Sequence, residues 1–149
     1  MPKAFKFQIH DAAGWTMFVF GVLAFLLGLT GLLRPEWTLT MLGFEVVDRA
    51  QRAAGDYTIV FVIAASMASF NMGVYYVLAA LNDLKAFYRW TVPFRGLTFL
   101  VFTTVVLAGI APTRFIGVGL WEGLGAIATG LALYFESDRT SRRGNGEEA

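Results

Sequence analysis

The stretch Phe115 to Phe135, FIGVGLWEGLGAIATGLALYF, decides the fold class of this chain. It is 21 residues long and carries one charge, Glu122, which falls well inside the run. About 20 residues at about 1.5 Å each cross a hydrocarbon core of about 30 Å, so apolar runs of this length are typical of membrane-spanning helices. The sequence therefore predicts that this stretch is a transmembrane helix.

Three further apolar segments precede it. The first two carry no charge, and the third ends directly before a proline, so that only a very short link joins it to the last segment. Such a link predicts a tight antiparallel helical hairpin, because proline cannot continue a helix. We expect an all-α, integral membrane bundle of four antiparallel (up-down-up-down) transmembrane helices, forming a single membrane domain, with spans at about 12–33, 57–81, 93–111 and 115–135.

The composition supports this class and argues against several activities. Only 15% of the residues are charged, against about 25% in a typical soluble domain. The net charge of +1 gives no reason to expect nucleic acid as a partner. The chain has no cysteine and one histidine, His10, and it lacks the glycine-rich phosphate-binding and zinc-protease motifs. We therefore expect no catalytic set, no metal site and no cofactor, and the sequence favours a non-enzymatic role.

The long first connection predicts a short amphipathic helix over about residues 44–54, FEVVDRAQRAA. Its apolar residues recur at helical spacing, and Glu45–Arg49 and Asp48–Arg52 are i,i+4 pairs in the favourable order. Such a helix would lie on the membrane surface, either solvated or docking a partner. The polar, glycine-containing segment 137–149 predicts a flexible C-terminal tail.

The distribution of basic residues predicts the orientation of the spans. Four spans place both termini on one side of the membrane, and that side carries eight of the 12 basic residues. Basic excess marks the cytoplasmic side. We therefore expect both termini in the cytoplasm and segment 34–56 outside, in a cell membrane such as a bacterial inner membrane. The eight residues are Lys3, Lys6, Lys85, Arg89, Arg95, Arg139, Arg142 and Arg143.

Glu122 is the main candidate for chemistry. Counting from the connecting turns places Asn71, Thr103 and Thr104 at a similar depth, so the sequence predicts a polar mid-membrane layer of these four residues. A charge at such a depth costs on the order of 3 kcal/mol, and such residues usually face the bundle or a partner.

Three hypotheses for Glu122 remain open at this point. It could be protonatable or bind a cation, with the amide and hydroxyl side chains as partners. It could be a neutral side chain that holds helices together by one hydrogen bond, or a carboxylate reaching a local water pocket. It could instead form a salt bridge with another subunit.

Small residues recur at spacings that allow close helix packing. We expect them to pack within the bundle, or to contact another subunit or a flat lipid-soluble ligand such as a quinone. They are Ala65, Ser69, Gly73, Gly119, Gly123, Ala126 and Gly130. Arg95 and Trp90, near the start of the third predicted span, are expected at the lipid headgroups.

The sequence thus favours a small multi-pass membrane protein that acts as a non-enzymatic accessory, assembly or structural subunit of a membrane complex. Its expected partners are the lipid bilayer and other membrane subunits or further copies of itself, with a bound lipid or quinone as an additional possibility. One alternative is a small homo-oligomeric proton- or ion-linked transporter or channel that uses Glu122. Another is a lipid- or quinone-binding membrane protein.

Overall fold

The computed structural model describes residues 9–147, and the side chains of residues 9–138. This part of the chain is all-helical, with α1 (Ala12–Leu33), α2 (Pro35–Met41), α3 (Thr58–Leu81), α4 (Lys85–Leu107) and α5 (Ile116–Glu147). Short 3-10 turns lie at Arg49–Gln51 and Thr113–Phe115. Four of the helices, all except α2, are long and apolar enough to cross a membrane. The predicted fold class is confirmed.

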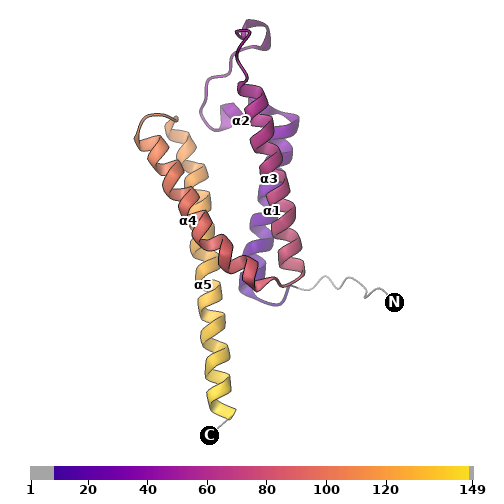
Figure 1. The fold of residues 1–149 in the computed structure, drawn as a ribbon, viewed down its shortest axis with the longest axis vertical. Coiled ribbons are helices and arrows are strands. Elements are labelled where there is room, and N and C mark those ends of the chain that lie inside the picture. The colour runs from indigo at the N-terminus through magenta and orange to yellow at the C-terminus, as the bar shows by residue number, and fades with distance from the viewer. Residues whose placement is uncertain (1–8, 148–149) are drawn as a thin grey trace, which may run out of the picture.

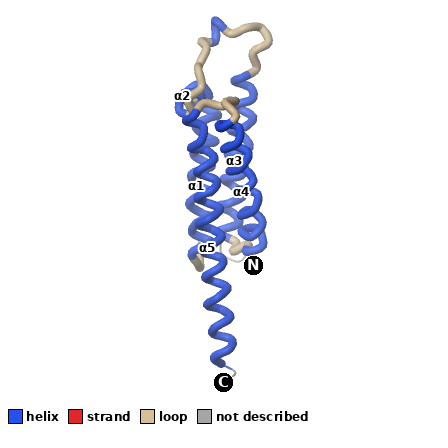
Figure 2. Tube along the Cα trace, turned by 90° about the vertical axis from the view of Figure 1, so that its left-hand side faces the viewer, coloured by secondary structure: helices blue, strands red, loops and turns tan. Residues whose placement is uncertain are grey.

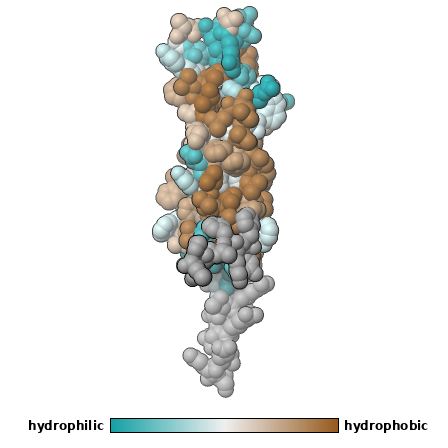
Figure 3. Space-filling view, turned by 90° about the vertical axis from the view of Figure 1, so that its right-hand side faces the viewer, coloured by the Kyte–Doolittle hydropathy of each residue, from teal (hydrophilic) through white to brown (hydrophobic). Residues whose placement is uncertain are grey.

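The four long helices form two hairpins (Figure 1). Helices α1 and α3 lie side by side, and α4 and α5 form the second pair. The loop between α2 and α3 projects at one end of the bundle, and α5 extends beyond the bundle at the opposite end (Figure 2). Hydrophobic side chains cover the middle of the face seen in Figure 3, and hydrophilic ones gather at the loop end.

The contact between α1 and α3 is a seam of small residues. From Gly21 to Gly31 the buried positions of α1 alternate in steps of three and four, which is the spacing that keeps one face against a neighbouring helix. A Cβ on Gly28 would lie 2.4 Å from the Phe70 nitrogen, and one on Gly73 would lie 2.4 Å from the Phe25 nitrogen. The two backbones therefore touch, as small residues allow in lipid. The glycines of α1 in this seam are Gly21, Gly28 and Gly31, whose Cβ positions would meet Tyr76, Phe70 and Ser66 of α3.

Of the predicted ridge of Ala65, Ser69 and Gly73, the last two residues lie against α1. Gly73 is buried against α1, and the Ser69 hydroxyl donates a hydrogen bond to the Ala24 carbonyl at 3.0 Å. Ala65 is exposed, and the adjacent Ser66 is buried against α1 in its place. The prediction was wrong at this position because the seam advances by three and four residues alternately, not by four each time.

The third span differs from the predicted segment 93–111. Helix α4 begins at Lys85, so most of the expected connection is helical, and Pro93 lies inside the helix. The helix bends in Figure 1, and proline is a usual cause of a bend because it removes a backbone hydrogen bond. It ends at Leu107 because Gly109, at φ +70°, closes the last turn in a conformation that favours glycine.

The predicted amphipathic helix over 44–54 is wrong, since only the turn Arg49–Gln51 is helical there. The arginines that were expected to pair within it bind acidic residues outside it. Arg49 lies 2.6 Å from Glu36 of α2, and Arg52 lies 3.4 Å from Asp56. Helix α2 is absent from the prediction, because a proline after a long apolar run indicates the end of a helix, whereas Pro35 occupies the first turn of the next helix.

The last helix also runs further than expected. We predicted a span over 115–135 and a flexible tail from residue 137, but α5 continues to Glu147. Segment 136–143 contains no glycine or proline, and its glutamate and arginine residues have good helix propensity, so nothing in it interrupts the helix. Residues 148–149 of the predicted tail lie outside the described part of the chain.

Candidate functional site

A buried arginine–glutamate pair joins α4 and α5 inside the membrane-spanning part of the bundle. The Arg95 Nε lies 3.2 Å from the Glu122 Oε2. The Arg95 side chain is 3% exposed and that of Glu122 is 20% exposed. Glu122 therefore finds its partner within its own chain.

Aromatic side chains from α1 and α5 surround the pair. The Arg95 guanidinium lies over the Phe20 ring, with its Cζ 3.4 Å from the ring centroid. The Phe20 ring stacks in turn on Trp121, the neighbour of Glu122, at 4.7 Å between centroids. A guanidinium over an aromatic face is attracted by the ring quadrupole, and more strongly where water is absent. The α1–α3 hairpin thus contributes directly to the site through Phe20.

Gly125 of α5 makes the space that the guanidinium occupies. A Cβ at this position would lie 1.5 Å from the Arg95 Nη2, so every other residue type would collide with the guanidinium. The Nη2 itself is buried and has no hydrogen-bond partner in the described part of the chain. A guanidinium offers five N–H donors, so Arg95 keeps donors free beyond those that Glu122 accepts.

Pairing lowers the cost of holding these charges at membrane depth. An isolated charge there costs on the order of 3 kcal/mol, whereas the ion pair is neutral as a whole. Removing one partner would leave the other charge buried and uncompensated, which typically costs about 3–5 kcal/mol. The pair therefore ties α4 to α5.

The three residues predicted to form a polar layer with Glu122 differ in their surroundings. Thr104 is exposed and donates to the Leu100 carbonyl at 2.8 Å, so its assignment to the layer was wrong. Thr103 faces Gly119, and its buried hydroxyl has no hydrogen-bond partner in the described part of the chain. Asn71 is half-buried on α3.

Arg95 is the partner that sequence reasoning missed. We placed it at the lipid headgroups, and its burial shows that this was wrong. The predicted start of the span near Pro93 put Arg95 at the membrane edge, whereas α4 begins at Lys85. Counting outward from the turn between α4 and α5 places Arg95 level with Gly125, and this count could have revealed the pair. Trp90 is exposed, and its role at the headgroups stays a prediction.

The other small residues of α5 lie along its contact with α4. A Cβ on Gly119 would meet Thr103 Oγ1 at 3.4 Å, and one on Gly123 would meet the Phe99 ring at 3.0 Å. Ala126 is buried. Gly130 is more open, because the nearest atom to its Cβ position is Val92 Cγ1 at 3.5 Å.

A second charged cluster lies where the foot of α4 meets the start of α1. The Lys85 ammonium binds Asp11, the cap of α1, and lies 3.0 Å from the Glu136 carboxylate of α5. Glu136 also accepts a hydrogen bond from the Ala13 nitrogen at 2.9 Å. Burial alone would raise the pKa of Asp11, but hydrogen bonds from Lys85 and the Gly14 nitrogen outweigh it, so this pKa is lowered.

Two further contacts connect the hairpins. The hydroxyls of Thr16 and Thr129 lie 3.1 Å apart between α1 and α5, and Thr129 is fully buried. At the loop end, Phe44 meets Phe115 at 5.8 Å between ring centroids, and Phe115 meets Phe102 at 5.1 Å. The two hairpins are thus joined at the foot, in the middle and at the loop end.

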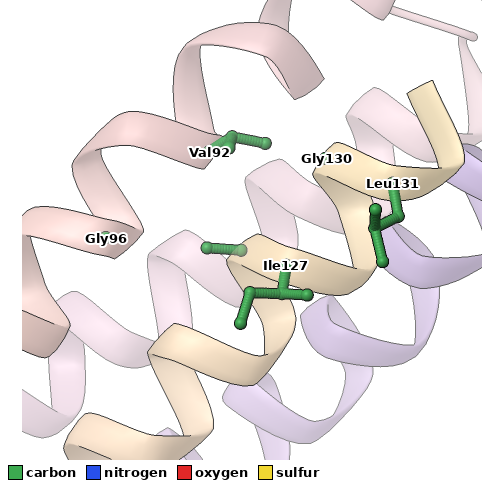
Figure 4. A pocket seen from close by; sticks show the side chains of 6 residues that line it. Val92, Gly96, Ile127, Gly130 and Leu131 are labelled. Atoms are coloured by element: carbon green, nitrogen blue, oxygen red, sulfur yellow. The ribbon is translucent and has the colours of Figure 1, made fainter. Parts of the chain in front are cut away.

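Two apolar grooves mark the surface. The α4–α5 groove, of about 380 Å³, is lined by Val92, Gly96, Ala126, Ile127, Gly130 and Leu131 (Figure 4). The α1–α5 groove, of about 490 Å³, lies beside the Arg95–Glu122 pair, and its lining includes Trp15, Thr16, Phe20, Trp121, Gly125 and Ala128.

The fold and its apolar surface define a multi-pass helical membrane protein. Within residues 9–138 no three histidine, cysteine or acidic side chains gather in a way that could hold a metal ion. Comparison of the chain with protein-family models, with curated proteins and with solved structures finds no match.

Proposed function

We propose that this protein is an accessory subunit of a membrane complex, and that a transmembrane helix of another subunit packs into its α4–α5 groove. The observation that carries this proposal is the open glycine surface of that groove. Gly96 has no atom within 4 Å of its Cβ position, and Gly130 has only Val92 near it. Both glycines line the groove, together with aliphatic side chains.

The α1–α3 seam of the same molecule gives a comparison. There, the glycines lie against the backbone of the neighbouring helix, at distances that only glycine allows. In lipid, small residues favour helix association because they let backbones approach closely and gain van der Waals contact. The α4–α5 groove offers a similar surface of small residues without a covering helix, which supports a partner helix as its occupant.

The shape of the groove favours a different subunit over a second copy. A two-fold symmetric dimer would place the same surface of both copies face to face. Two grooves that meet in this way leave a gap between them, whereas a helix from another protein presents a ridge that fills one.

The Arg95–Glu122 pair supports a structural role over proton-linked transport. The Glu122 carboxylate lies 3.2 Å from the Arg95 guanidinium, a group that stays protonated in proteins. A carboxylate that shuttles protons would have to release this partner at each cycle. The pair instead secures the hairpin that bears the groove.

The experiment is site-specific photo-crosslinking in native membranes, with a photoreactive amino acid in place of Ile127. This residue lines the groove and is 59% exposed. We expect one discrete adduct of higher mass that contains a second membrane protein. The substitution Gly96→Leu fills the groove and should abolish the adduct. Gly117→Leu is the matched control, since Gly117 is equally open but lies outside the groove.

The outcomes separate the possibilities. An adduct that contains only this chain would indicate self-association in place of a separate subunit. Absence of any discrete protein adduct, or an adduct that persists in Gly96→Leu, would contradict the proposal.

A further inference from the structure

The α1–α5 groove is a separate surface from the one proposed for a partner helix. Its walls combine two tryptophans, Trp15 and Trp121, with Phe20 and aliphatic side chains. Gly125 and Ala128 leave its α5 side open. The hydroxyl of Thr16 is already satisfied, because it donates to the Ala13 carbonyl at 2.8 Å and pairs with Thr129. The groove therefore suits a flat, apolar molecule.

A free hydrogen-bond donor lies directly behind this groove. Phe20 and Gly125 line the groove, and both also touch the Arg95 guanidinium from the other side. The Arg95 side chain is 97% buried, as its exposed fraction is 3%, and its Nη2 has no partner among the described residues. A buried N–H without an acceptor is destabilising, so an acceptor that reached it would be favoured.

The charges of the site decide what kind of acceptor fits. Arg95 and Glu122 already neutralise one another. A bound carboxylate or phosphate would leave a net negative charge in a low-dielectric environment, which is costly. A neutral carbonyl oxygen would satisfy the Nη2 donor without adding charge.

We propose that the α1–α5 groove binds a neutral, planar, lipid-soluble carbonyl compound of the quinone type. The ring of the compound lies in the groove against Trp121, and one carbonyl oxygen passes over Gly125 to accept a hydrogen bond from the Arg95 Nη2. The aliphatic chain of the compound follows the groove into the lipid. This is a binding site and involves no electron transfer.

The test uses the full chain in phosphatidylcholine nanodiscs and a 1,4-benzoquinone with a decyl chain as the probe. The chain has four tryptophans, and Trp37 and Trp90 lie outside the groove lining. Replacing these two by phenylalanine leaves Trp15 and Trp121 as reporters, because quinones quench tryptophan fluorescence on contact. We expect saturable quenching. In competition, decylbenzene, which has the ring and chain but no carbonyl, should bind about tenfold more weakly.

Two groove-filling substitutions form the matched pair. Ala128→Leu fills the α1–α5 groove and should weaken quinone binding by about tenfold or more, whereas Gly130→Leu fills the α4–α5 groove and should leave it unchanged. The thermal stability of each variant shows whether it is folded. Four results would overturn the proposal: quenching that does not saturate, equal affinity in folded Ala128→Leu, equal competition by decylbenzene, or tighter binding of decanoate than of the quinone.

Discussion

The guanidinium of Arg95 meets three kinds of neighbour at membrane depth: a carboxylate, an aromatic ring and a glycine. Glu122 neutralises its charge, Phe20 covers its face, and Gly125 leaves the space in which it lies. Each neighbour comes from a helix other than α4. A single buried side chain therefore depends on the correct placement of both hairpins.

Thr103 provides a test of the polar layer at the scale of one residue. Its buried hydroxyl has no partner among the described residues, so the group is desolvated without a compensating hydrogen bond. Thr103→Val replaces it by a methyl group of similar size. We expect the free energy of unfolding in detergent to stay equal or to rise by about 1 kcal/mol. A loss of more than about 1 kcal/mol would show that the hydroxyl has a partner in the native protein.

Asp11 makes stability depend on pH. Its pKa lies below the ordinary value of 3.8 because Lys85 and the Gly14 nitrogen stabilise the carboxylate. A lowered pKa in the folded state means that the carboxylate stabilises the fold above the unfolded pKa, and that this contribution disappears as the pH falls through the folded pKa. We expect the thermal midpoint to fall as the pH drops below about 4.

The variant Asp11→Asn is the control for this dependence. It should have a lower thermal midpoint than the wild type at pH 7 and a flatter profile between about pH 5 and pH 2. Parallel profiles for the two proteins would show that other carboxylates cause the acid sensitivity.

At the scale of helices, the two hairpins use small residues in different ways. The α1–α3 seam is closed, with backbone against backbone, whereas Gly96 of α4 and Gly117 of α5 have open space where a Cβ would lie. Glycine lowers helix stability, so its presence in a helix needs a packing reason. On α1 the reason is α3, and on α4 we attribute it to the proposed partner helix.

A pair of Gly→Ala substitutions measures this difference. At Gly28 the new Cβ would lie 2.4 Å from the Phe70 nitrogen, so Gly28→Ala should lower the unfolding free energy by about 1–3 kcal/mol. At Gly117 nothing lies within 4 Å, so Gly117→Ala should be neutral or stabilising by up to about 1 kcal/mol. Equal effects in a detergent unfolding assay would contradict the close α1–α3 contact.

The sequence predicts the four spans well but not the elements that depend on distant contacts. Long uncharged runs identify α1 and α3 with nearly their observed bounds, because hydrophobicity alone determines such helices. The start of α4 at Lys85 could not be predicted in the same way, since Lys85 is held by Asp11 and Glu136 from other helices. The predicted helix over 44–54 is also wrong because of a distant contact, since Arg49 pairs with Glu36 of α2.

In the candidate site, too, the sequence reveals what depends on local sequence and misses what depends on distant contacts. Glu122 was recognised because a charge within an apolar run needs an explanation, and this signal is local. To recognise Arg95 as the partner, one must know where α4 begins. The predicted start at about residue 93 places the arginine at the membrane edge, whereas the observed start at Lys85 places it in the core. Phe20 and Gly125 carry no signal in the sequence, since an aromatic residue and a glycine are both ordinary in a membrane span.

For the whole molecule, contacts at three depths join the hairpins. Lys85 with Asp11 lies at the foot, Arg95 over the Phe20 ring in the middle, and Phe44 with Phe115 at the loop end. The polar contacts at the foot and the aromatic contact at the loop end are consistent with interfaces at the two ends of the apolar belt. The middle contact lies between them in the hydrocarbon region.

The orientation in the membrane remains a prediction that labelling can test. The chain has no cysteine, so single cysteines can be introduced without background. Ala53, in the loop between α2 and α3, and Ala86, at the foot of α4, are both exposed. A membrane-impermeant maleimide added to intact cells should label Ala53→Cys and not Ala86→Cys, because basic excess keeps the foot in the cytoplasm. The reverse pattern would invert the topology.

The Arg95–Glu122 pair ties α4 to α5 at membrane depth, and a double-mutant cycle tests this most directly. Unfolding free energies in detergent are measured for the wild type, Glu122→Gln, Arg95→Met and the double variant. Each single substitution should cost about 3 kcal/mol, because it leaves a buried group without its partner. The double variant should cost less than their sum, with a coupling of about 2–3 kcal/mol. Additive effects of the two substitutions would contradict the account.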